Sequence, residues 1–435
     1  MPNGKLRTKL NLLTMRGDKD GTASMFQLIR YRSTAPPTAA SPKFPLLLHP
    51  SPTQEENLIS RLGVALCTCP EGFQLRYLGS YMLDVPARLG HNPALDTAVE
   101  CLLQSHSQLL RVRSSPSGRV PTDSKYSKAL RALQGAIVDP TLAMSAETAC
   151  AAILMCRYEM MMPEARGAQY VTHAQGACNL ILLRGPGAIS TEFERGLLRA
   201  QTGQLVLNAF FWGEDCVLLQ DSWQHVTRGK QKTFKVTKLD QLFETVYHIP
   251  SLVKQISDFK NGKSVMNMDQ LTSYAKRLQE ELVSLSATEA TSSKATEGTD
   301  QDLGYDQILL WADDDIFPIV LSFHSREGAV FHSWVWMASL MVDMCMDNLV
   351  PDPRLRDSMS EAARRICMCY EYVSLLKPIG ALYLQLQLTA AYYVSDQRQR
   401  DWIVEKVNII MEDLHIHFSS SYFETIGSLL FKGLS

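Results

Sequence analysis

The sequence predicts an all-α protein whose helices form an antiparallel array. From residue 54 onward, apolar residues recur at three- and four-residue spacing, as expected of amphipathic helices. Few runs alternate β-branched with polar residues, and turn signals built from Gly, Pro, Asn and Ser separate the helical segments. Because short connections favour antiparallel neighbours, the predicted architecture is a stacked helical bundle.

Length and charge set broad limits on function. A chain of 435 residues can form one large helical domain or several smaller ones. It contains 43 Lys and Arg against 45 Asp and Glu, a net charge of −2, so no global attraction to nucleic acid or to an anionic membrane is expected. The apolar stretch 329–346 is interrupted by His332, Ser333, Ser339 and Asp343 and falls short of a membrane span. The sequence therefore predicts no membrane partner.

Residues 1–53 are predicted to be a basic, proline-rich and disordered tail. Its cations are Lys5, Arg7, Lys9, Arg16, Lys19, Arg30 and Arg32. The prolines crowd residues 33–52, where they remove amide donors and favour extended backbone. Two helical parts are expected after this tail, at 54–283 and 303–435. Between them, residues 284–302 are rich in Ser and Thr and are predicted to be a disordered linker.

The helices of the first part begin and end at recognisable signals. Asn92 and Pro93 start a helix with an apolar stripe to Leu109, and a second stripe covers 126–137 until Asp139 and Pro140 stop it. The third helix has Ser145 as its N-cap and Glu147 in its first turn, where a carboxylate is favoured.

The next two helices flank a Gly-Pro-Gly stop. The segment 172–184 carries Arg184 in its last turn and ends at Gly185, and a fifth helix is expected from Thr191 to Trp212. Later, the residues 330–345 are apolar nearly all round, which predicts a buried central helix. Further helices are predicted at 358–376, 378–394 and 396–414.

Familiar catalytic and metal-binding motifs are missing from the sequence. It contains no P-loop, no G-x-G-x-x-G turn, no G-x-S-x-G elbow and no H-E-x-x-H helix, so an enzyme of a familiar class is not expected. Cysteines two residues apart occur at Cys67 and Cys69 and at Cys367 and Cys369, a spacing too short for the usual structural zinc site. We therefore predict no catalytic residue, no metal ligand and no cofactor.

The segment 172–187 raises the sharpest functional question. His173 has two interpretations, a general base or anion ligand and a hydrogen-bonded structural residue, and the second is favoured because no motif places a nucleophile beside it. Arg184 is expected to cap its helix or to pair with an acid such as Glu159. Gly176 and Ala177 are small enough to admit a neighbouring backbone. The prediction is a packed joint between helices.

The order of these short motifs resembles the fungal-specific transcription factor domain. The motifs are Ala129-Leu130, Leu133, Ala136, Asp139-Pro140, Glu147-Thr148, Leu154, Tyr158-Glu159, His173, Gly176-Ala177, Leu180 and Arg184-Gly185-Pro186. The segment 89–106 upstream, and 363–372 and 388–407 near the C-terminus, are similar to the same family. The resemblance spans roughly residues 55–425 and assigns these motif residues a structural role.

This resemblance implies a helical regulatory region that normally follows a zinc binuclear cluster in nuclear regulators of metabolic or secondary-metabolite genes. It also implies protein partners, either co-regulators or a second copy, and a small-molecule effector. The cluster requires six cysteines beginning C-x2-C-x6-C, and residues 1–66 contain none. DNA would then be reached only indirectly or through a missing N-terminal module, because of an overlooked exon, a true loss or reuse of the domain.

Three functions follow as hypotheses. The leading one is a nuclear transcription regulator that acts through protein partners. The alternative is an all-α enzyme or ligand-binding accessory protein of a biosynthetic pathway, which requires a deep pocket with converging polar groups. A helical adaptor without a transcriptional role is the third.

Overall fold

The computed structural model describes residues 53–112, 123–162, 168–227, 236–287, 303–309 and 316–434. Thr53–Ser435 form one compact unit. The predicted tail, apart from Thr53, and residues 288–302 of the predicted linker lie outside the described residues. The following account therefore concerns the helical unit alone.

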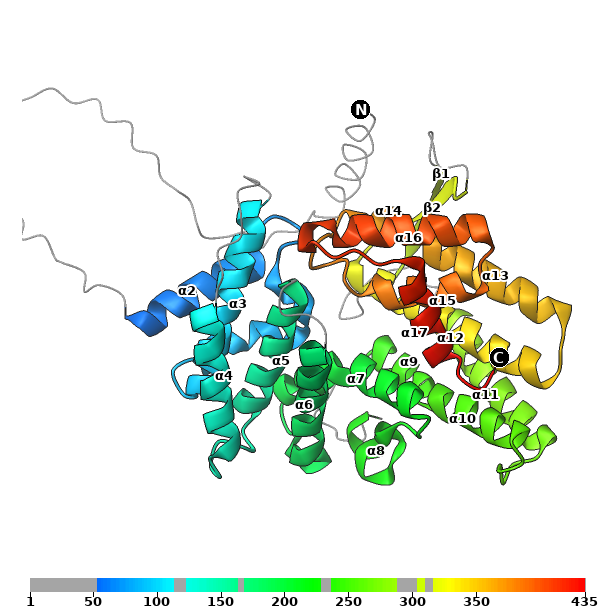
Figure 1. Ribbon diagram of the computed structural model, residues 1–435, viewed down its shortest axis with the longest axis horizontal. Coiled ribbons are helices and arrows are strands. Elements are labelled where there is room, and N and C mark those ends of the chain that lie inside the picture. The colour runs from blue at the N-terminus through cyan, green and yellow to red at the C-terminus, as the bar shows by residue number, and fades with distance from the viewer. Residues whose placement is uncertain are drawn as a thin grey trace, which may run out of the picture. The chain divides into compact units, whose positions relative to one another are not determined.

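The described chain is mostly helical, which confirms the all-α class (Figure 1). The helices before residue 288 are α2 (Gln54–Cys67), α3 (Pro93–Val112), α4 (Asp123–Val138), α5 (Ala146–Met161), α6 (Ala168–Arg184), α7 (Glu192–Trp212), α8 (Asp221–Thr227), α9 (Lys238–Val246), α10 (His248–Lys260) and α11 (Met268–Ala287). The later helices are α12 (Arg326–Leu349), α13 (Pro353–Met368), α14 (Tyr370–Ser374), α15 (Leu384–Val394), α16 (Gln397–Met411) and α17 (Ser420–Leu430).

Helices α3 to α6 pack against one another as neighbours, with α5 contacting α3, α4 and α6 (Figure 1). The predicted N-cap Ser145 accepts a hydrogen bond from the amide of Thr148. Thr191 caps α7 in a capping box with Glu194, in which each side chain binds the other residue's amide. Both predicted helix starts are confirmed.

Helix α12 is the central helix that the sequence predicts. It contacts α10, α11, α13 and α15, and most of its side chains are buried, from Phe331 through Leu340 to Cys345. By length and composition alone it is apolar enough to cross a membrane, yet 78% of its most apolar window is buried inside the protein. The burial identifies a core helix of a large helical unit.

A small antiparallel hairpin is the one departure from helix and turn that the sequence analysis missed in the described ranges. Strands β1 (Tyr305–Leu309) and β2 (Ile319–Phe323) pair with Tyr305 opposite Phe323. Phe323 packs on Tyr372 and Trp336 at ring-centre distances of 5.3 and 6.5 Å. The hairpin thus covers the core beside α12.

Several predicted boundaries were wrong. Helix α11 continues to Ala287, four residues into the predicted linker at 284–302. The predicted helix 358–376 is divided into α13 and α14, and α13 begins at Pro353, where Asp352 supplies the N-cap. The predicted helix 378–394 begins only at Leu384.

Two segments of the helical unit that lie far apart in the sequence meet at Gly72. Its carbonyl accepts hydrogen bonds from the amides of Ile379 and Gly380, at 2.9 and 3.3 Å. Gly72 has φ +88°, and a Cβ there would collide with the carbonyl of Lys377, so only glycine fits this approach. The amides near Pro378 are thereby used in a long-range contact instead of a helix.

Candidate functional site

Several residues that carry the family resemblance lie at the contacts between α4, α5, α6 and α7. The start of α5 is one such contact. Asn92 Nδ2 donates to Ser145 Oγ and Thr148 Oγ1, at 3.2 and 3.0 Å, which links the start of α3 to the start of α5. Glu147 accepts a 2.6 Å hydrogen bond from Arg88 Nη1. The acid of the Glu147-Thr148 motif therefore forms an ion pair between helices.

The Tyr158-Glu159 motif supplies a buried carboxylate. Glu159 has 0% of its surface exposed, and one of its oxygens, Oε1, binds both the hydroxyl of Tyr126, at 2.6 Å, and Nδ1 of His173. Tyr158 stacks on the Tyr126 ring, with centres 5.2 Å apart. We call Tyr126, Glu159 and His173 the Glu159 cluster. It joins α4, α5 and α6 at one buried point, and His173 makes the hydrogen bond that its structural interpretation predicts.

The Glu159 cluster contains one carboxylate oxygen without a hydrogen-bond partner, and cysteine thiols lie nearby. The second carboxylate oxygen, Oε2, is buried and has no hydrogen-bond partner. Burial raises the pKa of Cys101, Cys156 and Cys178 to about 12, so these thiols stay protonated and are poor nucleophiles. Burial, followed by the bond to Glu159, also raises the pKa of Tyr126. The cluster therefore links three helices through a single carboxylate oxygen.

Arg184 does not pair with Glu159, which was the acid named from the sequence. Its Nη2 binds Glu194 Oε1 at 2.6 Å and its Nε donates to the carbonyl of Met144 at 3.0 Å. The physical reason is position: Arg184 lies at the C-terminal end of α6, beside the starts of α5 and α7, whereas His173 and Tyr126 occupy Glu159. Arg184 thus ties three helix ends together.

Of the remaining motif residues, Asp139, Pro140 and Gly185 lie in turns, and Gly176 has open space beside its Cα. Asp139 Oδ1 accepts from the amide and the hydroxyl of Thr141, at 2.7 and 2.6 Å, and begins the turn that Pro140 continues. Gly185 has φ +73° and donates its amide to the carbonyls of Ile181 and Leu182, so the predicted stop after α6 is confirmed. Gly176 was expected to admit a neighbouring backbone, and among the described residues this was wrong, because a Cβ there would meet no atom of theirs within 4 Å.

Ala177, next to Gly176, is the small residue that packs inward. With Ala174, Cys178 and Ile181 it is buried against the rest of the unit. The side chains that sequence reasoning missed are Arg88, Asn92 as a helix link, Tyr126 as a ligand of Glu159, and Glu194. Only Glu194 had a local signal, its place three residues after the cap Thr191.

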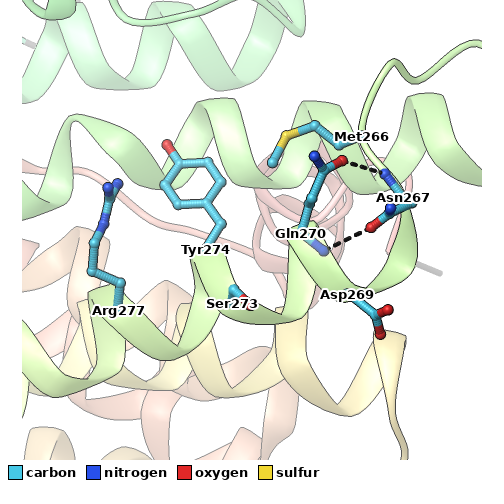
Figure 2. Close-up of a pocket in the computed structure, with 7 residues that line it drawn as sticks. All are labelled: Met266, Asn267, Asp269, Gln270, Ser273, Tyr274 and Arg277. Carbon is cyan, nitrogen blue, oxygen red and sulfur yellow. Dashed lines mark hydrogen bonds between the residues drawn. The ribbon is translucent and has the colours of Figure 1, made fainter.

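The surface of the described residues includes two open depressions that bear on function. The first, about 340 Å³, is lined by Asp84, Ala87, Arg88, His91 and Glu147. The second, about 660 Å³, we call the α11 groove; it is lined by Met266, Asn267, Asp269, Gln270, Ser273, Tyr274 and Arg277 (Figure 2).

The polar groups of the α11 groove are largely used within the protein. Asn267 and Gln270 exchange two hydrogen bonds of 2.9 Å at the start of α11 (Figure 2). The hydroxyl of Tyr274 lies 3.0 Å from His248 Nδ1, and burial raises the pKa of Tyr274 to about 12. The Arg277 guanidinium lies 5.1 Å from the centre of the Tyr274 ring. The groove therefore offers an aromatic ring, a thioether and a cation rather than a set of converging catalytic groups.

Metal-binding geometry was sought over the described ranges. There, no group of three or more His, Cys, Asp or Glu side chains is placed to hold a metal ion. The ten cysteines are free thiols, and Cys367 and Cys369 are buried. Comparison of the chain with protein-family models, with curated proteins and with solved structures finds no match.

Proposed function

We propose that this protein is a regulator of transcription that resembles the fungal zinc-cluster factors and acts through protein partners in the nucleus. The proposal rests on where the residues that carry the resemblance lie in the structure. Residues scattered from Asp139 to Gly185 contribute to turns and buried links between successive helices, most tightly in the Glu159 cluster. A motif set that builds a helical scaffold suits a regulatory domain of this type.

The role of the chain follows from its chemistry. The thiols beside Glu159 are held protonated by burial, and His173 is engaged by the carboxylate, so the segment is suited to packing and not to turnover. Target genes would include metabolic or secondary-metabolite genes, and DNA would be reached through a partner or an N-terminal zinc module. The α11 groove, with Tyr274, Met266 and Arg277, is the candidate place for a small effector.

The same groove favours the second candidate, a ligand-binding accessory protein or all-α enzyme of a biosynthetic pathway. Methionine and aromatic surfaces adapt to varied apolar ligands, and Arg277 supplies a charge that selects anionic ones. Purified protein would then bind or convert a pathway intermediate, and its loss would change metabolites while transcripts of unlinked genes stay constant.

The test is deletion of the gene in its own organism, with transcript sequencing and imaging of a tagged copy. We expect nuclear accumulation and altered expression of a defined gene set, restored by the wild-type chain. Complementation with Glu280→Ala, an exposed acid on α11, is the matched control and should restore expression fully. Unchanged transcripts together with a cytoplasmic tagged protein would refute the proposal.

A further inference from the structure

Arg157 of α5 is a cation inside the helical unit that has no acidic partner among the described residues. It is half-buried, and its Nη2 donates to the backbone carbonyl of Ala200 on α7 at 2.9 Å. It makes no ion pair with any acid of the described ranges. Glu159, the acid nearest to it in the sequence, is two positions away, so the two side chains leave the helix in different directions. The described chain therefore leaves the charge of Arg157 uncompensated.

One donor of this guanidinium also has no acceptor. The Nε atom of Arg157 is buried, and no described residue accepts a hydrogen bond from it. A buried donor without a partner carries its full desolvation cost, and the cost is greater when the donor is charged. The position beside Nε therefore favours an acceptor, and a negatively charged acceptor most of all.

The hydroxyl of Tyr81 is a second buried donor of this kind. Tyr81 is 1% exposed, and its hydroxyl has no hydrogen-bond partner among the described residues. Tyr81 packs on the same part of α7, because a Cβ at Gly196, one turn before Ala200, would lie 3.0 Å from its own Cβ. Burial raises the pKa of Tyr81, and the nearby charge of Arg157 opposes this rise without reversing it, so the hydroxyl keeps its proton. A guanidinium only donates, so it cannot accept that proton.

Two buried thiols also lie within reach of the Arg157 charge. Burial raises the pKa of Cys156 and of Cys178 to about 12, although the charge of Arg157 opposes the rise. Both thiols are therefore protonated and neutral. The Sγ of Cys178 donates to Gln201 Oε1 at 3.5 Å. Like Tyr81, these thiols offer protons to their surroundings and supply no negative charge to Arg157.

We propose that Arg157 Nε and the Tyr81 hydroxyl bind a small monovalent anion of the size of chloride between α5 and α7. One such ion accepts from both donors and neutralises the guanidinium. A water molecule would accept from the donors but leave the charge uncompensated. A small ion suits the position better than a phosphate or an organic acid, because the bond from Arg157 to Ala200 already holds the two helices together. Arg157 is half-buried, so the ion can enter along its side chain.

The experiment is thermal unfolding of the purified full chain while sodium chloride replaces sodium gluconate at constant ionic strength. An ion that binds only the folded chain raises Tm with its concentration, and the curve gives an apparent affinity. Arg157→Met removes the charge and Tyr81→Phe removes only the hydroxyl, and each should weaken that affinity at least about tenfold. Arg131→Met, the same substitution at an exposed cation on α4, is the matched control and should respond as the wild type does. Bromide-soaked crystals should also show an anomalous peak beside Arg157 Nε.

Two results would overturn the inference. One is a wild-type Tm whose chloride dependence is shared by Arg157→Met and Tyr81→Phe, since a general salt effect acts on all of them alike. The other is a water molecule beside Arg157 Nε with no anomalous signal from bromide. If Arg157→Met does not fold, the comparison of wild type with Tyr81→Phe decides the matter. The test measures ion binding and not transcripts, so its failure leaves the proposed function as it stands.

Discussion

Two buried carboxylates, Glu159 in α5 and Asp343 in α12, are held in contrasting ways. Glu159 is 0% exposed and Asp343 is 2% exposed, and each lies where three helices meet. Glu159 places one oxygen against Tyr126 and against His173, whose imidazole can carry a positive charge.

Asp343 instead distributes its oxygens between neutral donors. Oδ1 accepts from Gln279 Nε2 at 2.7 Å and Oδ2 accepts from Ser358 Oγ at 2.6 Å. Burial raises the pKa of Asp343 because neither donor neutralises its charge. The comparison teaches that one buried acid shares a single oxygen between a phenol and an imidazole, whereas the other satisfies both oxygens with neutral donors and has a raised pKa.

The largest effect is expected from Glu159→Ala. The substitution leaves a cavity and removes the shared acceptor of Tyr126 and His173, so the free energy of unfolding should fall by about 3 kcal/mol. Urea unfolding monitored by circular dichroism measures it. The control Glu280→Ala, at an exposed acid, should change the free energy of unfolding by less than about 0.5 kcal/mol. A similarly small loss for Glu159→Ala would contradict the stabilising role given to Glu159 in this comparison.

A smaller loss, about 2 kcal/mol, is expected from His173→Ala, since the buried carboxylate then retains only Tyr126. The same unfolding assay applies. His417→Ala, at an exposed histidine, is the control and should be nearly neutral. Equal stability of the two variants would mean that the imidazole contributes nothing to the Glu159 cluster.

The smallest effect at neutral pH is expected from Asp343→Asn. The free energy of unfolding should change by less than about 1 kcal/mol. The Ser358 hydroxyl can accept a hydrogen bond from the new Asn amide as well as donate one, and the Gln279 amide can rotate to match it. Since the pKa of Asp343 is raised above its ordinary 3.8, its folded form binds a proton more tightly than its unfolded form. Its contribution to stability is therefore complete below that value and is lost as pH rises through the folded pKa.

The pH dependence sharpens the comparison further. The stability of wild type minus that of Asp343→Asn should increase as pH is lowered from about 7 toward about 4. Unfolding curves for both proteins at each pH give this difference, in which the other carboxylates cancel. A difference that decreases on acidification would contradict the raised pKa.

Local signals explain what could be predicted from the sequence. The starts of α5 and α7 at Ser145 and Thr191 and the stop at Gly185 depend on residues a few positions apart, so the sequence reveals them directly. The Glu159 cluster depends on residues 14 and 33 positions from Glu159. Periodicity predicts which face of a helix is buried, but not which side chains of two helices meet.

The same limit explains the errors. Arg184 was expected to cap its helix or to pair with an acid such as Glu159, and the acid that it meets is Glu194 at the start of α7. Gly176 was expected to admit a neighbouring backbone, but no described atom lies within 4 Å of the position of its Cβ. The hairpin of β1 and β2 has strands of five residues, too short for a clear alternating pattern.

The central claim is that His173 joins α6 to α5 through the buried carboxylate of Glu159. A double-mutant cycle of Glu159→Ala and His173→Ala, measured by urea unfolding, tests it most directly. The account predicts that the two losses are not additive and that the coupling energy is at least about 1 kcal/mol. Additive losses, with coupling near zero, would show that the histidine is not committed to the carboxylate and would contradict the account.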